Sequence, residues 1–300
     1  MAGERLAGDL AFIGHMCFDE VIPFAGSPRL APGSAVLCGA VAAARAGASV
    51  AVVTRMAVKD EEILEPLRRA GVTVHVSPAA STTYMKVIHP SSDVDERKMI
   101  QQTSAGRFTP SDVPDLDARQ VHLAGITDQE FDLGFARAMK SRGYRLSADM
   151  QSFVRQVDPV THEISFADVA AKAQIVSLLD MVKLDVVEAN ILTGTDDLER
   201  AARRFEDWGS PETLITRADG VLARVNGKTY WEPFTNRSVV GRTGRGDTTF
   251  AAYMARRLGH EPAESLKFAA ALVSLKMEKA GPFDGSLADV LKRMSTYVQN

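Results

Sequence analysis

The sequence has little of several features that would decide its class at once. Of its 300 residues only Cys17 and Cys38 are cysteines, too few for a disulfide framework. No apolar run approaches the roughly 18 residues of a membrane span. The net charge of −3 provides no basic field for nucleic acid. We therefore expect neither a disulfide-stabilised scaffold nor a membrane or nucleic-acid partner.

Several familiar functional motifs are also missing. The six histidines are scattered, and none forms H-x-x-x-H or pairs with a cysteine at ligand spacing, so a zinc site is not expected. No G-x-S-x-G is present to support a hydrolase nucleophile. Residues 1–9 carry charges at both ends without a long apolar core, which does not match a signal peptide. The sequence thus predicts a cytoplasmic protein with reduced thiols.

What the chain does have is an alternation of apolar runs and amphipathic segments, typical of an α/β protein. The segments predicted as main-sheet strands are 10–14, 48–54, 72–76, 121–124, 145–149, 175–183 and 213–216, followed by a hairpin over 221–230. The predicted helices are 34–45, 61–70, 131–142, 164–174, 186–192, 198–208, 250–258, 263–279 and 287–298. No linker interrupts this pattern. We expect a doubly wound, mostly parallel sheet flanked by helices, in a single α/β domain spanning 1–300.

Two segments, approximately 19–31 and 82–102, do not fit the alternation. The first is short and punctuated by Gly26 and Pro28. The second contains two apparent strands joined by the polar loop 90–96. We expect these segments to form a small β appendage that acts as a lid.

The most informative stretch is 239–254, where a β-branched run leads into Gly-Arg-Gly-Asp at 244–247 and then into a helical pattern. Glycines before a helix let backbone N–H groups converge on an anion, which the positive end of the helix also attracts. A Walker A loop would carry Lys where Asp247 stands, and a dinucleotide motif would carry Gly at Thr249. The turn predicts an anion site, and Asp247 is either a proton acceptor beside it or simply the N-cap of the helix.

This turn and several other motifs, in matching order along nearly the whole chain, resemble the ribokinase-like (PfkB) carbohydrate kinases. Residues 244–247 resemble the G-A-G-D signature of that family, with Arg245 in place of Ala. The resemblance implies a ribokinase-like fold and transfer of the γ-phosphate of ATP to a hydroxyl of a sugar, polyol or nucleoside. It also implies that Asp247 is the general base and that the backbone of Gly244, Arg245 and Gly246 forms the anion hole.

The same resemblance assigns residues to the phosphoryl acceptor. Asp19, at the end of the first strand, resembles the family residue that hydrogen-bonds substrate hydroxyls. Gly33 and Ser34, ahead of an Ala-rich helix, resemble the N-terminal Gly-Gly signature with its second glycine replaced. Gln151 and Arg155 are similar to the spelling in archaeal inositol kinases, and a Gln side chain, which donates and accepts, suits a polyol. The alternative is that Gln151 is a plain loop residue.

The donor side is assigned in the same way. Lys183, Asp185 and Glu188 resemble the K-x-N-x-x-E stretch whose polar residues organise magnesium and phosphates through water, with Asp185 where Asn is usual. The resemblance therefore implies ATP and Mg²⁺ as cofactors, with Asp185 and Glu188 on the metal side. The residues assigned to the nucleotide are Lys183, Thr216, Arg217, Gly220, Thr243 and Ser274.

Departures from the family pattern leave alternatives open. The Arg245 side chain could reach the phosphates or point to solvent. Gly241-Arg242 stands where many members carry Asp-Thr, whose acid helps to hold a monovalent cation, so potassium activation is not expected. The acceptor remains open between a ring polyol such as inositol, a furanose or hexose, and a nucleoside, in that order. A non-catalytic sugar- or nucleotide-binding relative is the alternative class, and a homodimer through the lid is a further expectation.

Overall fold

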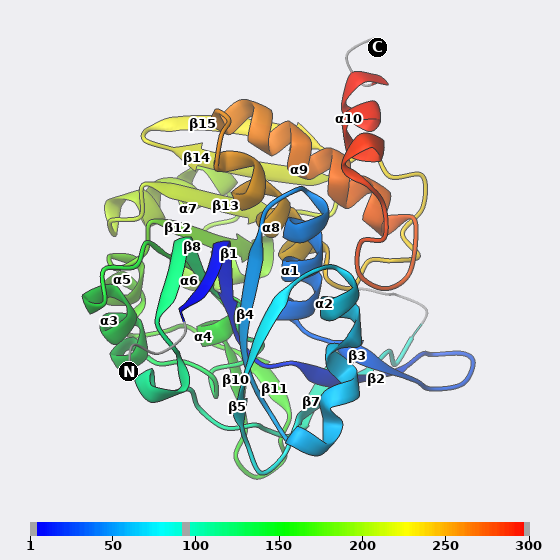
Figure 1. Ribbon diagram of the computed structural model, residues 1–300. Coiled ribbons are helices and arrows are strands. Elements are labelled where there is room, and N and C mark those ends of the chain that lie inside the picture. Colours follow the sequence, from blue (N-terminus) through cyan, green and yellow to red (C-terminus); the bar gives the residue numbers. More distant parts are fainter. Residues whose placement is uncertain (1–4, 92–96, 297–300) are drawn as a thin grey trace.

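The computed structural model describes residues 5–91 and 97–296 (Figure 1). Its main element is a nine-stranded sheet in the order β15-β14-β13-β12-β9-β8-β1-β4-β5. The strands are β1 (Leu6–Ile13), β4 (Val50–Met56), β5 (Thr73–Pro78), β8 (Leu116–Leu123), β9 (Leu146–Asp149), β12 (Met181–Asp185), β13 (Glu212–Thr216), β14 (Gly220–Val225) and β15 (Lys228–Pro233). All pairs from β13 to β5 are parallel, whereas β14 and β15 add an antiparallel hairpin. The predicted doubly wound α/β fold is confirmed.

Helices cover both faces of the main sheet (Figure 1). One hydrophobic cluster includes residues of α1 (Ala35–Arg45), α2 (Glu65–Arg69), α8 (Arg245–Arg257), α9 (Pro262–Met277) and α10 (Leu287–Thr296). The other includes residues of α3 (Leu133–Ser141), α5 (Lys172–Val176), α6 (Val186–Thr193) and α7 (Leu198–Asp207). Alternate residues of β1 divide between them, with Phe12 in the first and Ile13 in the second. Burial on both faces explains the continuous apolar runs of the parallel strands.

The prediction for 164–183 is wrong. The predicted helix begins as β11 (Ile164–Phe166), which pairs antiparallel with β10 (Arg155–Val157). The predicted strand begins as the end of α5, and β12 starts only at Met181. Ile175 and Val176 are buried from a helix rather than from a strand, and short apolar runs do not distinguish the two by periodicity.

Other boundaries also moved. The predicted helix 61–70 is a 3-10 turn, η1 (Val58–Leu64), leading into α2. A second 3-10 turn, η2 (Pro110–Asp112), precedes β8, and α4 (Gln151–Val154) follows β9. Helix α8 begins at Arg245, five residues before the predicted start at 250. The last predicted helix, 287–298, runs past the described residues at 297. No helix within 5–91 or 97–296 is both long and apolar enough to cross a membrane.

A separate four-stranded sheet extends from the body of the molecule (Figure 1). Its order is β3-β2-β6-β7, made of β2 (Cys17–Ile22), β3 (Arg29–Gly33), β6 (Thr83–Ile88) and β7 (Lys98–Thr103). The β2–β6 pair is parallel and the other two pairs are antiparallel. These strands contain most of the segments predicted at 19–31 and 82–102, and part of the predicted loop 90–96 lies outside the described residues. Only three residues separate β1 from β2, so the small sheet starts at the carboxyl end of the main sheet.

Candidate active site

A cavity of about 600 Å³ lies between the small sheet and the carboxyl ends of the main-sheet strands. Parallel strands all end at this edge, which brings side chains from distant parts of the chain together. The predicted site residues that line it are Asp19, Ser34, Gln151, Arg155, Lys183, Asp185, Thr216, Thr243, Gly244, Arg245, Gly246 and Asp247. Acceptor-side and donor-side residues therefore face a common space.

The turn at the start of α8 presents Asp247 to this cavity. Gly244 is the N-cap, in the left-handed conformation (φ 78°), and Asp247 is the third helical residue. The first α-type hydrogen bond of the helix runs from the Thr248 amide to the Gly244 carbonyl, 2.9 Å apart. The interpretation of Asp247 as an N-cap is therefore wrong, and no capping bond uses its carboxylate.

The backbone amides of the predicted anion hole differ in whether they already have a hydrogen-bond acceptor. The Arg245 N–H donates to the Arg242 carbonyl, 3.1 Å away. The N–H groups of Gly246 and Asp247 lie ahead of the first α-type hydrogen bond, where a helix leaves its donors without intrahelical acceptors. These two amides are the donors best placed for an anion.

The glycines of the turn make room for neighbouring elements. A Cβ at Gly244 would lie 2.4 Å from the Cys38 sulfur on α1. A Cβ at Gly246 would lie 2.7 Å from the Lys183 Nζ. Any larger residue at either position would displace a wall of the cavity. The sequence motif thus reflects close packing as well as backbone freedom.

Lys183 forms a buried ion pair with Asp149, a residue that the sequence analysis did not assign. Its Nζ lies 2.6 Å from the Asp149 Oδ2, and both side chains are almost fully buried. Burial raises the pKa of Asp149 to about 6, and Lys183 opposes this rise. Burial alone would lower the pKa of Lys183, but Asp149 and other carboxylates raise it. The sequence signal that could have identified Asp149 was its position as an acidic residue at the end of the predicted strand 145–149.

Asp19 and Gly33 meet at the start of the small sheet. A Cβ at Gly33 would lie 1.9 Å from the Asp19 Oδ2, so Gly33 leaves space for this carboxylate. The Cys17 thiol donates to the Asp19 Oδ1 at 3.2 Å. The pKa of Asp19 is raised to about 6, mainly by burial. The hydrogen bond from Cys17 opposes this rise, and the charge of Asp247 contributes to it. Asp19 and Asp247 line the same cavity.

Ser34 occupies the position of the second family glycine with a glycine-like backbone. Its φ is 131°, which L-residues rarely adopt. Its hydroxyl accepts from the Leu37 amide at 3.0 Å and caps α1. Backbone strain of this kind concentrates at functional sites.

Gln151 belongs to α4, so its interpretation as a plain loop residue is wrong. The side chain is buried, and its amide nitrogen donates to the Gly125 carbonyl at 2.8 Å. Arg155 lies over the Phe166 ring, 5.7 Å from its centroid, and its Nη2 is 3.6 Å from the Glu188 Oε1. Both residues line the cavity and are held in place by protein contacts.

Asp185 and Glu188 form a capping box at the start of α6. Glu188 accepts from the Asp185 amide through Oε2, whereas its buried Oε1 has no hydrogen-bond partner. Burial, followed by the charge of Asp185, raises the pKa of Glu188 to about 8. The Asp185 carboxylate lines the cavity, whereas Glu188 lies behind it, with its Oε1 free of hydrogen bonds but 3.6 Å from the Arg155 Nη2. Two neighbouring carboxylates of this kind fit Mg²⁺, which binds few carboxylates and keeps several waters. Within 5–91 and 97–296 no group of three or more His, Cys, Asp or Glu could hold a metal, so water and donor oxygens would complete the shell.

Three residues assigned to the nucleotide do not line the cavity: Arg217, Gly220 and Ser274. Arg217 pairs with Asp219 at 2.7 Å and stacks on Trp231. A Cβ at Gly220 would lie 2.4 Å from Trp231, so this residue is packed beneath the ring. The Ser274 hydroxyl donates to the Ala270 carbonyl at 2.6 Å. These three residues are engaged in packing and hydrogen bonds outside the cavity lining.

Three arginines of the cavity lie close enough for their charges to interact. Arg97, immediately before the small-sheet strand β7, was not assigned from the sequence, but it lines the cavity with Arg242 and Arg245. Burial lowers the pKa of Arg245, and the positive charge of Arg242 adds to this effect. The Arg245 side chain therefore lies in a cluster of cations rather than in open solvent. Counting Arg155 and Lys183, five cationic side chains and three carboxylates line the cavity among residues 5–91 and 97–296.

The chain matches the family model described as pfkB family carbohydrate kinase over residues 9–288. It belongs to the PfkB family. The resemblance is confirmed, and membership makes the protein a phosphotransferase that acts on the hydroxyl of a sugar or polyol.

This PfkB chain is similar to a cytidine kinase, a pyrophosphate-dependent kinase and a ribokinase. It is 28% identical over 259 residues to the cytidine kinase of Thermococcus kodakarensis, covering 82% of this chain and 87% of that protein. It is 30% identical to a pyrophosphate-dependent kinase in the ribokinase family, solved with a pyrophosphate analog and myo-inositol (TM-score 0.86; 94% of this chain, 99% of that chain). Arabidopsis thaliana ribokinase, solved with ribose and ATP, is 19% identical (TM-score 0.76; 96% and 99% covered) and shows the fold alone.

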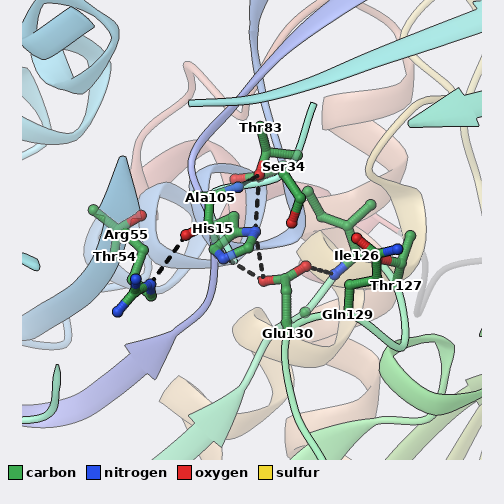
Figure 2. Close-up of polar contacts among 12 residues, drawn as sticks. His15, Ser34, Thr54, Arg55, Thr83, Ala105, Ile126, Thr127, Gln129 and Glu130 are labelled. Carbon is green, nitrogen blue, oxygen red and sulfur yellow. Dashed lines mark hydrogen bonds and ion pairs between the residues drawn. The ribbon is translucent and has the colours of Figure 1, made fainter. Parts of the chain in front are cut away.

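In this PfkB protein a buried polar network joins the connection between β1 and β2 to the start of β6 in the small sheet (Figure 2). The Glu130 carboxylate accepts from the backbone N–H groups of His15, at 2.7 Å, and Ile126, at 2.5 Å. The His15 ring lies 2.9 Å from both the Thr83 hydroxyl, at the start of β6, and the Gly106 carbonyl. Because a carbonyl only accepts, His15 carries its proton on Nε2. No sequence pattern marked Glu130, whose partners are set by the fold.

Replacing Glu130 with Ala is expected to destabilise this PfkB protein. Two buried N–H groups would lose their acceptor, at a cost of about 1–3 kcal/mol each. Urea unfolding at equilibrium measures the change, with Glu62→Ala, at an exposed position, as the control. Equal unfolding midpoints for the two variants would contradict the role of Glu130.

Proposed function

We propose that this protein transfers the terminal phosphoryl group of ATP to a hydroxyl of a small ring polyol, with Mg²⁺. The observation that carries the proposal is the shared cavity, which Asp19 lines together with the glycine turn and its Asp247. A hydroxyl held by Asp19 would thus lie between the catalytic carboxylate and the anion site. Phosphoryl transfer depends on such positioning and on electrostatic stabilisation more than on covalent catalysis.

The chemistry follows from this placement. The acceptor hydroxyl donates to Asp19 or Asp247, and Asp247 takes its proton as the new O–P bond forms. The bond between the transferred phosphorus and the bridging oxygen breaks, and the rest of the donor leaves with that oxygen. The Gly246 and Asp247 amides, with Lys183 behind them, stabilise the negative charge of the transferred group. Bound Mg²⁺, on the side of Asp185 and Glu188, would supply further charge neutralisation on the donor phosphates.

The small sheet supplies the part of the site that excludes water. Val87 of β6 and Met99 of β7 line the same cavity as the glycine turn. Water competes with the acceptor hydroxyl for the phosphoryl group, so an apolar cover protects the reaction. We propose that this sheet acts as the lid. The homodimer expected through its edge stays a prediction.

The acceptor side supports a ring polyol. Asp19, Gln151 and Arg155 offer polar groups, and Met85 and Ile126 offer apolar contact for the carbon face of a ring. The solved relative with myo-inositol supports the same class, and the cytidine kinase supports a nucleoside as the next candidate. In the order of candidate acceptors, a furanose or hexose stays between the ring polyol and the nucleoside.

Three observations favour pyrophosphate as the alternative donor to ATP. Arg97, Arg242 and Arg245 suit a compact, highly charged donor because guanidinium groups bind phosphate oxygens in pairs. Three residues expected to contact a nucleotide, Arg217, Gly220 and Ser274, lie outside the cavity lining. The relative that is 30% identical is pyrophosphate-dependent.

A matrix of donors and acceptors tests the proposal. The protein would be incubated with Mg²⁺ and either ATP or pyrophosphate, against myo-inositol, ribose, fructose and cytidine, and the phosphomonoester quantified. We expect turnover with ATP and the highest kcat/KM for the ring polyol. Turnover with pyrophosphate but not with ATP would show that pyrophosphate is the donor. No product with any pair of donor and acceptor would overturn the proposal.

The pH dependence of kcat/KM for the acceptor should report Asp19. Since its pKa is about 6, the carboxylate is ionised above that pH and loses its acceptor capacity below it. We expect kcat/KM to fall about tenfold per pH unit below 6, the slope of a single essential ionisation of the free enzyme. Asp149, also near 6, faces Lys183 on the donor side, so the KM of the donor would report it instead. An Asp19→Asn variant that kept the same profile in acceptor kcat/KM would contradict the assignment.

A further inference from the structure

We propose that Lys276 is a positioning residue for phosphoryl transfer, acting as a built-in cation that holds the turn before the anion site and adds positive charge behind it. The inference rests on the proposed function, because it concerns the same anion site. It assigns a role to a lysine that the sequence analysis passed over as part of a helical pattern.

The contacts of Lys276 are with another segment of the chain. The residue lies on α9 and is 2% exposed, and its Nζ donates to the backbone carbonyls of Gly241 and Thr243. The Gly241 amide in turn donates to the Met277 carbonyl at 2.8 Å. A Cβ at Gly241 would lie 1.7 Å from the Lys279 carbonyl oxygen. The turn is therefore fixed against the end of α9 from both sides.

This arrangement differs from ordinary helix capping. A lysine in the last turn of a helix commonly bonds the final carbonyls of its own helix. Lys276 instead reaches the loop that leads into α8, and its Nζ lies 3.9 Å from the Cβ position of Gly244. The charge is thus placed beside the N-cap of the helix that carries Asp247.

The charge of Lys276 is not neutralised by an ion pair in the described part of the chain. No Asp or Glu there lies within 4.0 Å of its Nζ. Burial lowers the pKa of Lys276, and the nearby charges of Cys38, if ionised, and Asp247 raise it. A buried cation bonded only to neutral carbonyls is costly. A phosphoryl anion at the start of α8 would supply the missing negative charge.

Carbonyl oxygens pointing at a common centre are also the ligands of a monovalent cation in proteins. The Lys276 ammonium fills that position for the carbonyls of Gly241 and Thr243. This agrees with the expectation from Gly241 that potassium does not activate the protein. It also predicts that removing the ammonium creates a site that an external cation can fill.

The test combines variants with added cations. Lys276→Met and Lys276→Ala should lower kcat by about 10–100-fold, the range for losing charge-assisted hydrogen bonds. Added KCl or NH₄Cl should restore at least part of the Lys276→Ala activity, whereas tetramethylammonium chloride at equal ionic strength should not. Lys276→Arg keeps the charge and should retain more activity than Lys276→Met. Lys279→Met, which removes an exposed lysine paired with Asp284, is the matched control.

A second readout separates this inference from the proposed function. Calorimetric titration with pyrophosphate and with sulfate measures anion affinity without any turnover. Weaker anion binding by folded Lys276→Met and by Lys276→Ala, recovered in Lys276→Arg, would support the role of Lys276 even if no acceptor were phosphorylated. Wild-type activity and wild-type anion affinity in Lys276→Met would overturn it. Equal loss in Lys276→Ala with and without K⁺ or NH₄⁺, together with unchanged anion affinity, would also overturn it.

Discussion

Replacing Asp247 with Asn is expected to lower kcat by about 10²–10⁴-fold, the usual contribution of a general base. The amide keeps the size of the carboxylate but cannot take the proton of the attacking hydroxyl. Because Asp247 is not the N-cap of α8 and makes no capping bond, the substitution should leave the helix intact. The loss should therefore fall on kcat rather than on folding.

The control is the same chemical change in the first turn of another helix. Asp289 of α10 lies outside the cavity lining, and its carboxylate accepts from the N–H and the hydroxyl of Ser286, so Asp289→Asn perturbs a helix start more than Asp247→Asn does without touching the site. Steady-state kinetics of both variants, with calorimetric affinities for donor and acceptor, separate chemistry from binding. If Asp247→Asn kept more than half of the wild-type kcat, the hydroxyl proton would have another acceptor.

Replacing Gly244 with Ala is expected to produce the second large loss, about 10²–10³-fold in kcat, comparable with the removal of an oxyanion-hole donor. The new methyl group would lie 2.4 Å from the Cys38 sulfur, and the residue would keep a φ near 78° that Ala disfavours. Either the turn or α1 must move, and the amides at the start of α8 would lose their alignment.

Gly194 provides a matched control for this substitution. It has a φ of 73° at the end of α6, and no atom lies within 4 Å of its Cβ position. Gly194→Ala thus carries the backbone penalty without the collision. The difference in kcat between the two variants measures the effect of displacing the turn. Equal activities would show that the anion site tolerates this displacement.

Local sequence patterns predicted the parts of the candidate site that are formed by residues close together in the chain. The glycine turn lies next to Asp247 in the chain, and its helix start and its position at the sheet edge follow from nearby residues. Asp19 and Gly33 were also predicted, through the resemblance of their local motifs to family motifs. Asp19 is the third residue of β2, however, and not the end of the first strand, which is Ile13 of β1. The antiparallel pairing of β2 with β3 then brings Asp19 and Gly33 together.

Contacts between distant segments were not predictable in the same way. Glu130 bonds His15 across 115 positions, Lys276 bonds Gly241 across 35, and Lys183 pairs with Asp149 across 34. Each partner is chosen by sheet order and helix packing, which periodicity does not specify. The failure at 164–183 has a different cause, because Ile175 and Val176 favour strands by propensity but are buried by the packing of α5.

The most direct test of the account is a rapid-quench, single-turnover experiment with protein in excess over a donor labelled in its terminal phosphoryl group. The wild-type protein should move the label to the polyol as a phosphomonoester in one phase, with no labelled protein. Asp247→Asn should slow that phase by the factor given above while binding both substrates. Label on the protein, or equal rates for the two proteins, would contradict direct transfer with Asp247 as the base.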